Sequence, residues 1–378
     1  MEPLLFLYPI VVLFSIGLIV AYFCRQYKLP VPLLILVTGI VFGKLGLPAQ
    51  VSQIPTPFIW ALAATALVMV SYDTFSRMRL HKQDSSSLQA MHVTGVMYAL
   101  GLVFIAAVLV ISGFLQDIWY VIIASACIAC VSSPWMGFGS LRIRNFLKEE
   151  AVYSEAAALI IAGLIMQFFI FSKDAILTDS FLLNMSSYSL QIIFGLGTGV
   201  VIGLIVFKLF RKATKAVSPI ALIAICLTCY TVAELMNASG LFAIIALAIL
   251  YGGFTIKHRQ SLEEFSKNFA MIMEMMILLV LGVVVSIPLN LMFFVFSFIA
   301  FVVYLLIRYF SIKAVMNYFT HKDILKMCFA APKGVGTAVI AVFAFTTVGG
   351  GVLPALQVVV AVMLYSQALS YLLHKVEV

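Results

Sequence analysis

Apolar stretches of about 20 residues recur along the whole chain, and this recurrence constrains the fold more than any other feature of the sequence. A helix of about 20 apolar residues crosses the roughly 30 Å hydrocarbon layer of a bilayer. Hydrophobic residues make up 64% of the 378 residues and charged residues only 10%. A soluble protein of this length would need more charge to cover its surface. The sequence therefore predicts an all-α polytopic membrane protein embedded in the lipid bilayer.

We predict about thirteen membrane-spanning helices. Loops on the cytoplasmic side of a membrane are rich in Lys and Arg. All basic residues except Lys44, Lys173 and Lys333 fall in or beside loops that share one side in this arrangement. The pattern predicts an N-terminus outside and a C-terminus inside. The predicted spans are residues 3–24, 31–48, 57–76, 90–113, 118–137, 150–172, 186–207, 217–236, 240–256, 268–287, 289–308, 324–346 and 352–373.

Several functional classes are not expected. The net charge of +8 follows the loop pattern and is scattered over short segments, so nucleic-acid binding is not expected. The first span lacks a basic leader and a cleavage site, which indicates a retained helix. Two C-x-x-C pairs, Cys127/Cys130 and Cys226/Cys229, lie in apolar spans, where packing explains them better than a metal. No phosphate-binding, zinc-protease or hydrolase motif is present, so we expect no enzyme and no cofactor.

One carboxylate in the predicted sixth span is the leading candidate for function. A charged side chain in hydrocarbon is costly and is usually retained for a functional reason. Glu155 follows a polar break in the fifth span, Ser132-Ser133-Pro134. Proline beside polar residues in a span indicates an unwound helix, whose freed backbone groups can bind ions. Ser132 and Ser133 either complete such an ion site or satisfy the backbone at the break.

A second break is predicted in the twelfth span, where Pro332, Lys333, Gly334 and Gly336 follow one another closely. Interrupted fifth and twelfth spans are what an inverted repeat of six-span units joined by one linker helix would produce. We therefore predict inverted repeats with two broken, crossing helices. Lys333 is expected to form a buried ion pair, since an unpaired charge in low dielectric costs several kcal/mol.

With these motifs the chain resembles the cation:proton antiporter superfamily, particularly its sodium/proton exchanger branch. Tyr230–Ala243, with Glu234 followed by Ser239-Gly240, is similar to the family's pattern across the eighth and ninth spans. The remaining matches are individually short: Pro332-Lys333-Gly334, Glu150 through Glu155, Tyr72-Asp73-Thr74 and Arg308. Where the family has Thr-Asp-Pro this chain has Ser132-Ser133-Pro134, and where it has Asn-Asp or Asp-Asp this chain has Ser154-Glu155. A related branch of potassium/proton exchangers carries Ser-Ser at the break.

The resemblance implies an organisation and several roles. Residues 1–80 and 217–287 would form a scaffold that makes a homodimer, 88–172 and 289–378 a moving core, and 186–210 a linker helix. Glu150 would be the partner of Lys333. Asp73 either lines the ion path or is a charge at the membrane edge. Glu234 is expected to be structural, and Glu274 to pair with Arg308 or with another basic side chain.

The expected function is secondary active antiport of a monovalent cation, Na⁺ or K⁺, against H⁺. Glu155 would bind the cation and the proton in turn, with Ser132, Ser133 and Ser154 nearby, by elevator-type alternating access in a plasma membrane of prokaryotic origin. Two alternatives stay open at this point. The protein is a transport-degenerate sensory or partner-binding subunit, or it carries an anion or small acid attracted by Lys333.

Overall fold

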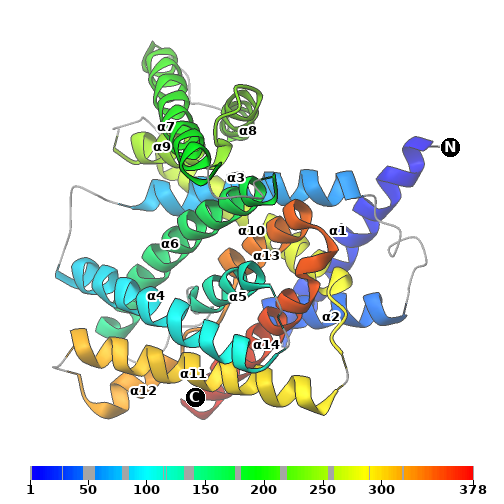
Figure 1. Ribbon diagram of the computed structural model, residues 1–378, viewed down its shortest axis with the longest axis vertical. Coiled ribbons are helices and arrows are strands. Elements are labelled where there is room, and N and C mark those ends of the chain that lie inside the picture. Colours follow the sequence, from blue (N-terminus) through cyan, green and yellow to red (C-terminus); the bar gives the residue numbers. More distant parts are fainter. Residues whose placement is uncertain are drawn as a thin grey trace. The chain divides into compact units, whose positions relative to one another are not determined.

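The computed structural model describes residues 2–27, 29–45, 56–78, 85–113, 115, 117–131, 140–174, 180–212, 219–253, 259–288, 290–316 and 319–377. Within these ranges all the regular elements are helices (Figure 1). They are α1 (Glu2–Gln26), α2 (Val31–Leu45), α3 (Thr56–Arg77), α4 (Ser85–Ile111), α5 (Ile118–Ala129), α6 (Leu141–Asp174), α7 (Ser180–Lys212), α8 (Pro219–Leu235), α9 (Gly240–Gly253), α10 (Arg259–Val284), α11 (Leu291–Val315), α12 (His321–Phe329), α13 (Val335–Val348), the 3₁₀ turn η1 (Gly350–Val352) and α14 (Leu353–Glu377).

The predicted all-α class is confirmed, and each predicted span overlaps one helix, except the twelfth, which α12 and α13 share. Among the described residues, six helices are long and apolar enough to cross a membrane. Shorter apolar helices, such as Ile118–Ala129 and Gly336–Val348, occupy other predicted spans. The number of spans and their orientation remain predictions.

The chain divides into two compact units. Unit 1 consists of Met1–Ala63, Asp84–Ala158 and Glu274–Val378, and unit 2 of Ala64–Gln83 and Leu159–Met273. Unit 1 contains α4, α5, α11, α12, α13 and α14, all predicted for the moving core, together with α1 and α2. The helices α3, α6 and α10 contribute residues to both units. The roles of core and scaffold remain predictions.

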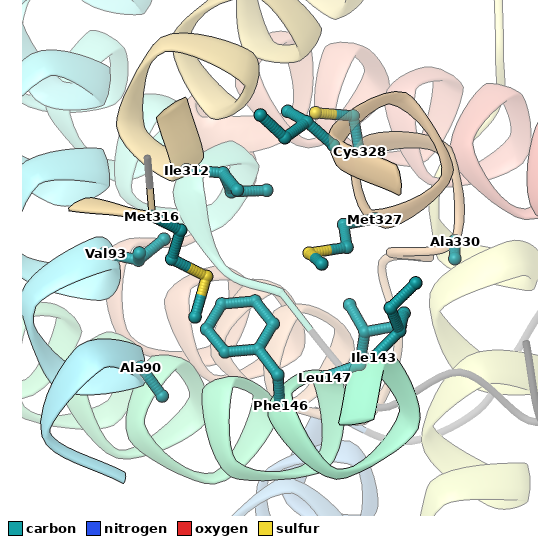
Figure 2. Packing of buried hydrophobic residues seen from close by; sticks show 11 residues of the cluster. Ala90, Val93, Ile143, Phe146, Leu147, Ile312, Met316, Met327, Cys328 and Ala330 are labelled. Carbon is teal, nitrogen blue, oxygen red and sulfur yellow. The ribbon is translucent and has the colours of Figure 1, made fainter. Parts of the chain in front are cut away.

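Within unit 1, α4 and α11 lie side by side (Figure 1), and an apolar cluster joins them to α6 and α12. Figure 2 shows the ring of Phe146, from α6, beside Met316, which follows α11. The cluster's buried members are Ala90, Val93, Ile143, Phe146, Leu147, Ile312, Met316, Ile324, Met327, Cys328 and Ala330. This packing fixes the helices that carry the buried charges described below.

Glycines allow two pairs of helices to approach closely. In unit 1, a Cβ atom at Gly39 of α2 would lie 2.5 Å from the Leu279 carbonyl oxygen of α10. In unit 2, Cβ atoms at Gly195 and Gly199 of α7 would lie 2.5 Å from the Ser239 carbonyl oxygen and 2.1 Å from that of Ala243. Small residues four apart let membrane helices pack backbone to backbone. Gly195 and Gly199 therefore allow the close contact between α7 and α9.

The Gly199→Ala variant is expected to destabilise the protein, because the added methyl group overlaps the α9 backbone. Overpacking of this kind costs about 1–3 kcal/mol. Gly197→Ala is the matched control, since a Cβ atom there would meet no atom within 4 Å. Thermal unfolding in detergent should show a lower midpoint for Gly199→Ala alone. Equal midpoints for the two variants would contradict the glycine contact.

The turn between α8 and α9 agrees with the structural role predicted for Glu234. The Gly240 amide donates a hydrogen bond of 2.9 Å to Glu234 Oε1, and Asn237 takes a left-handed conformation with φ of 54°. Asn accepts this conformation more readily than most residues. Glu234 thus joins the two helices of the turn and lies in unit 2.

Candidate functional site

The predicted twelfth span is interrupted at its proline and lysine. Helix α12 ends at Phe329 and α13 begins at Val335, and Pro332 and Lys333 lie in the irregular segment between them. Helix α5 ends at Ala129. Ser132, Ser133 and Pro134 lie outside the described residues, so their predicted roles remain predictions.

Lys333 joins the segment between α12 and α13 to the end of α5. Its ammonium group donates a hydrogen bond to the carbonyl oxygen of Cys130, directly after α5. In the first turn of α13, Thr337 Oγ1 donates to the Cys127 carbonyl oxygen over 3.4 Å. A helix C-terminus carries unsatisfied carbonyl groups and a partial negative charge. The ammonium group of Lys333, between α12 and α13, therefore stabilises the C-terminal end of α5.

The environment of Lys333 is closed by α11 and α14. The Lys333 side chain is fully buried, and its Nζ lies 3.4 Å from the centroid of the Tyr304 ring, a cation–π contact. The Lys333 amide donates to Ser366 Oγ over 3.0 Å, and Gln367 Nε2 donates to the Lys333 carbonyl oxygen over 2.7 Å. Side chains of α14 thus satisfy both backbone groups of Lys333, as an apolar interior requires.

Glu150 forms a buried ion pair with Arg308, which corrects the expected Lys333–Glu150 pair. Two guanidinium nitrogens of Arg308 each lie 2.7 Å from a carboxylate oxygen of Glu150. The same guanidinium donates to the Met327 carbonyl oxygen in the last turn of α12. The planar fork of Arg matches a carboxylate in two places, which the ammonium of Lys cannot do. Arg308 was one of the partners expected for Glu274, but it pairs with Glu150.

Ser154, predicted near the ion, binds the backbone just after α5. Its hydroxyl oxygen accepts a hydrogen bond of 2.9 Å from the Val131 amide, and the Tyr98 hydroxyl donates to the Ser154 carbonyl oxygen over 3.1 Å. Ser154 therefore holds the first break against α6. The next residue along α6 is Glu155.

Glu155 lies against the first turn of α13. A Cβ atom at Gly336 would lie 3.3 Å from Glu155 Cγ and 3.3 Å from Cys130 Sγ. Glycine at this position gives the carboxylate side chain its space beside the helix start. The N-terminal turn of a helix has a partial positive charge that favours an acidic neighbour. Unlike Glu150, Glu155 is partly accessible.

Asp73 does not belong to unit 1. It lies on α3 in unit 2, where its carboxylate forms an ion pair with Arg77 one turn later. Ser266 Oγ lies 3.5 Å from Asp73 Oδ1. The role of Asp73 in the ion path remains a prediction.

Comparison with models of protein families identifies one family. The model of the family described as sodium/hydrogen exchanger, transmembrane, matches residues 10–373. The chain belongs to this family. The sodium/hydrogen exchangers are membrane transporters and not enzymes, which confirms the expected absence of a catalytic role.

Solved structures show the same fold at low sequence identity. A structure of the sodium proton antiporter MjNhaP1 from Methanocaldococcus jannaschii at pH 8 has a TM-score of 0.75 at 15% identity, covering 98% of this chain and 99% of that chain. A three-dimensional electron microscopy map of MjNhaP1 gives a TM-score of 0.69 at 14% identity, with 99% and 96% covered. No curated protein matches the chain significantly.

Several residues of this exchanger's site had no signal in the sequence. Ser366 and Gln367 lie in an ordinary apolar span, and Tyr304 is one of 15 tyrosines. The only available sequence signal for Tyr304 was its spacing of one helical turn from Arg308, which places the two side chains on the same face of the helix. The described residues contain no group of three or more His, Cys, Asp or Glu side chains arranged for a metal ion. All six cysteines are buried and none forms a disulfide.

Proposed function

We propose that this sodium/hydrogen exchanger family member is a secondary active antiporter that exchanges a monovalent cation, Na⁺ or K⁺, for H⁺. Family membership supports cation/proton antiport in general. The choice of Glu155 as the exchanging group rests on the geometry of unit 1. The cation and the proton compete for one carboxylate, so both cannot be carried together, and this competition couples their movements.

The observation that carries the proposal is the position of Glu155 between the end of α5 and the start of α13. It follows Ser154, which binds the Val131 amide just after α5, and it lies against Gly336 in the first turn of α13. Of the two other acids on this part of α6, Glu149 is exposed and Glu150 is fully engaged by Arg308. On this part of α6, Glu155 is therefore the acid that is partly accessible and that lies next to both the end of α5 and the start of α13. Ser132 and Ser133 would add hard oxygen ligands, which suit such cations.

Transport by this route requires that Glu155 meets water from each side in turn. We propose a rigid-body, elevator-type movement of the core helices against a scaffold, in a homodimer in a prokaryotic plasma membrane. The many exposed apolar side chains of α7 and α11, including Ile193, Phe194 and Phe298, suit contact with lipid.

An anion or small acid is less well supported as the substrate. The ammonium group that would attract it, on Lys333, is fully buried and is already engaged by the Cys130 carbonyl oxygen and the Tyr304 ring. Moving that group to a substrate would uncap α5.

Ion-resolved transport by the purified protein tests the proposed function. Liposomes containing the protein and a pH-sensitive dye, acidic inside, are expected to become alkaline inside when Na⁺ or K⁺ is added outside. The signal should persist when the membrane potential is clamped, because one-for-one exchange moves no net charge. Empty liposomes are the control. Absence of a signal with Na⁺, K⁺ and Li⁺ would contradict antiport.

A further inference from the structure

Basic side chains gather at the end of unit 1 where α11 is followed by α12. Lys313 lies in the last turn of α11, and His321 and Lys322 are the first two residues of α12. All three side chains are exposed. Ile312 and Met327 belong to the apolar cluster that fixes the two helices beneath them (Figure 2). We call this region the α11–α12 corner and define it by Tyr309, Lys313, Phe319, His321 and Lys322.

Two aromatic side chains hold the basic groups of the corner. The Tyr309 hydroxyl oxygen lies 2.9 Å from His321 Nδ1, and Lys313 Nζ lies 5.9 Å from the centroid of the Tyr309 ring. One tyrosine therefore contacts a base of α11 and a base of α12. From α6, the guanidinium carbon of Arg142 lies 5.4 Å from the centroid of the Phe319 ring. These contacts bring basic groups of three helices to the corner.

The acid in the first turn of α12 does not balance these charges. Thr320 Oγ1 donates a hydrogen bond of 2.7 Å to Asp323 Oδ2 and accepts one of 3.3 Å from the Asp323 amide. Asp323 thus belongs to the helix cap, and it supplies one negative charge. Lys313, Lys322 and Arg142 supply three positive charges. The corner therefore has an excess of positive charge.

A strip of exposed apolar side chains leads from the corner along α11. Val302, Leu306 and Phe310 are 38%, 52% and 58% exposed. They are spaced four residues apart, so they lie on one face of the helix, and Lys313 follows Phe310 on that face. From Val302 to Lys313 the strip is about 16 Å long, which is about half of the roughly 30 Å hydrocarbon layer. The surface is thus apolar over the depth of one leaflet and basic at its end.

An anionic phospholipid matches both parts of this surface. Its phosphate group accepts hydrogen bonds from ammonium and guanidinium groups, and its acyl chains cover apolar side chains. Free phosphate would leave the apolar strip uncovered, and a zwitterionic headgroup carries its own cation beside the phosphate. In the predicted orientation the corner lies at the cytoplasmic leaflet, whose anionic lipids attract basic residues.

We propose that the α11–α12 corner binds one anionic phospholipid. Its headgroup contacts Lys313, His321 and Lys322, and its acyl chains lie along the apolar strip of α11. Because His321 Nδ1 is engaged with Tyr309, the other ring nitrogen, Nε2, faces away from Tyr309 and contacts the headgroup. The bound lipid connects α11 to α12 and so stabilises unit 1. This site goes beyond the proposed function and does not depend on it.

Lipid titration of the purified protein in an uncharged detergent tests the site. Phosphatidylglycerol is expected to raise the thermal unfolding midpoint by at least about 3 °C, because a ligand that binds only the folded protein stabilises it. Phosphatidylcholine at the same mole fraction, and inorganic phosphate in excess, should leave the midpoint near its lipid-free value. The half-saturating mole fraction of phosphatidylglycerol is the readout for variants.

Lys313→Gln is expected to raise the half-saturating mole fraction about fivefold, which is the usual effect of one basic group near an anionic membrane surface. Lys313→Gln/Lys322→Gln should raise it at least about tenfold, and Lys313→Arg, which keeps the charge, should stay within about twofold. Lys44→Gln is the matched control. Lys44 lies in the last turn of α2, three residues after the exposed Val41, just as Lys313 follows Phe310. Its half-saturating mole fraction should also stay within about twofold.

Every outcome supports or overturns the lipid site. It is overturned if phosphatidylglycerol causes no rise, or if phosphatidylcholine or inorganic phosphate causes an equal rise. Equal effects of Lys313→Gln and Lys44→Gln would assign the rise to surface charge in general and would also overturn it. If the double variant does not elute as a single species, the pair Lys313→Gln and Lys313→Arg decides. Loss of the lipid site would leave the proposed antiport standing, since the liposome assay measures antiport separately.

Discussion

Replacing Glu155 by Gln is expected to reduce cation-dependent proton movement in liposomes to the level of empty liposomes. Gln has nearly the shape of Glu but cannot ionise, so it neither binds a proton for release nor balances a cation. The fold should survive, because the amide fits the same space beside Gly336. The measurement is the dye signal with Na⁺, K⁺ and Li⁺, on protein that elutes as a single species.

The control for this prediction is Glu149→Gln. Glu149 lies on the same helix but is exposed, so the same chemical change there should leave the flux unaltered. Flux at the wild-type level in Glu155→Gln would mean that another group carries the proton. The assignment of Glu155 as the exchanging acid would then be wrong.

Removing the guanidinium of Arg308 should have the largest effect on stability. In Arg308→Met, Glu150 keeps its burial but loses both hydrogen bonds, and the Met327 carbonyl oxygen loses its donor. Breaking one side of a buried ion pair costs roughly 3–5 kcal/mol. The free energy of unfolding, measured by denaturant titration in mixed micelles, is expected to fall by about that amount.

Two further variants make the stability prediction specific. Arg308→Met/Glu150→Leu removes both charges, and we expect it to recover most of the loss, because apolar replacements of a whole buried pair are often neutral. Lys313→Met changes an exposed cation of the same helix and should cost no more than about 0.5 kcal/mol. A single variant at position 308 that unfolds like the wild type would show that the pair is not needed.

The helical class and the approximate helix positions were predictable because hydropathy over about 20 residues is a strong and local signal. The interruption between α12 and α13 was also predictable, since Pro332 and Gly334 both disfavour a continuous helix. The cost of a charge in hydrocarbon selects Glu155 as the candidate acid, and its role remains a prediction. These inferences need only neighbouring residues in the chain.

The partner of Glu150 could not be deduced from neighbouring residues. Arg308 is separated from it by more than 150 positions, and Lys333 was an equally charged candidate. The geometry that decides between them, a planar fork beside a carboxylate and a carbonyl group at the end of α12, exists only after the helices have packed. Ser366 and Gln367 escaped notice for the same reason, because their hydrogen bonds to Lys333 depend on where α14 lies.

The ion pair between Arg308 and Glu150 also determines the direction in which Glu155 points. The two acids are five residues apart on one helix, so Glu155 lies about 7.5 Å further along the axis and about 140° around it. Because the ion pair with Arg308 holds α6 in one orientation at Glu150, the regular geometry of the helix fixes the side of α6 on which Glu155 lies. In the proposed exchanger, the ion pair of Glu150 would therefore orient the exchanging acid.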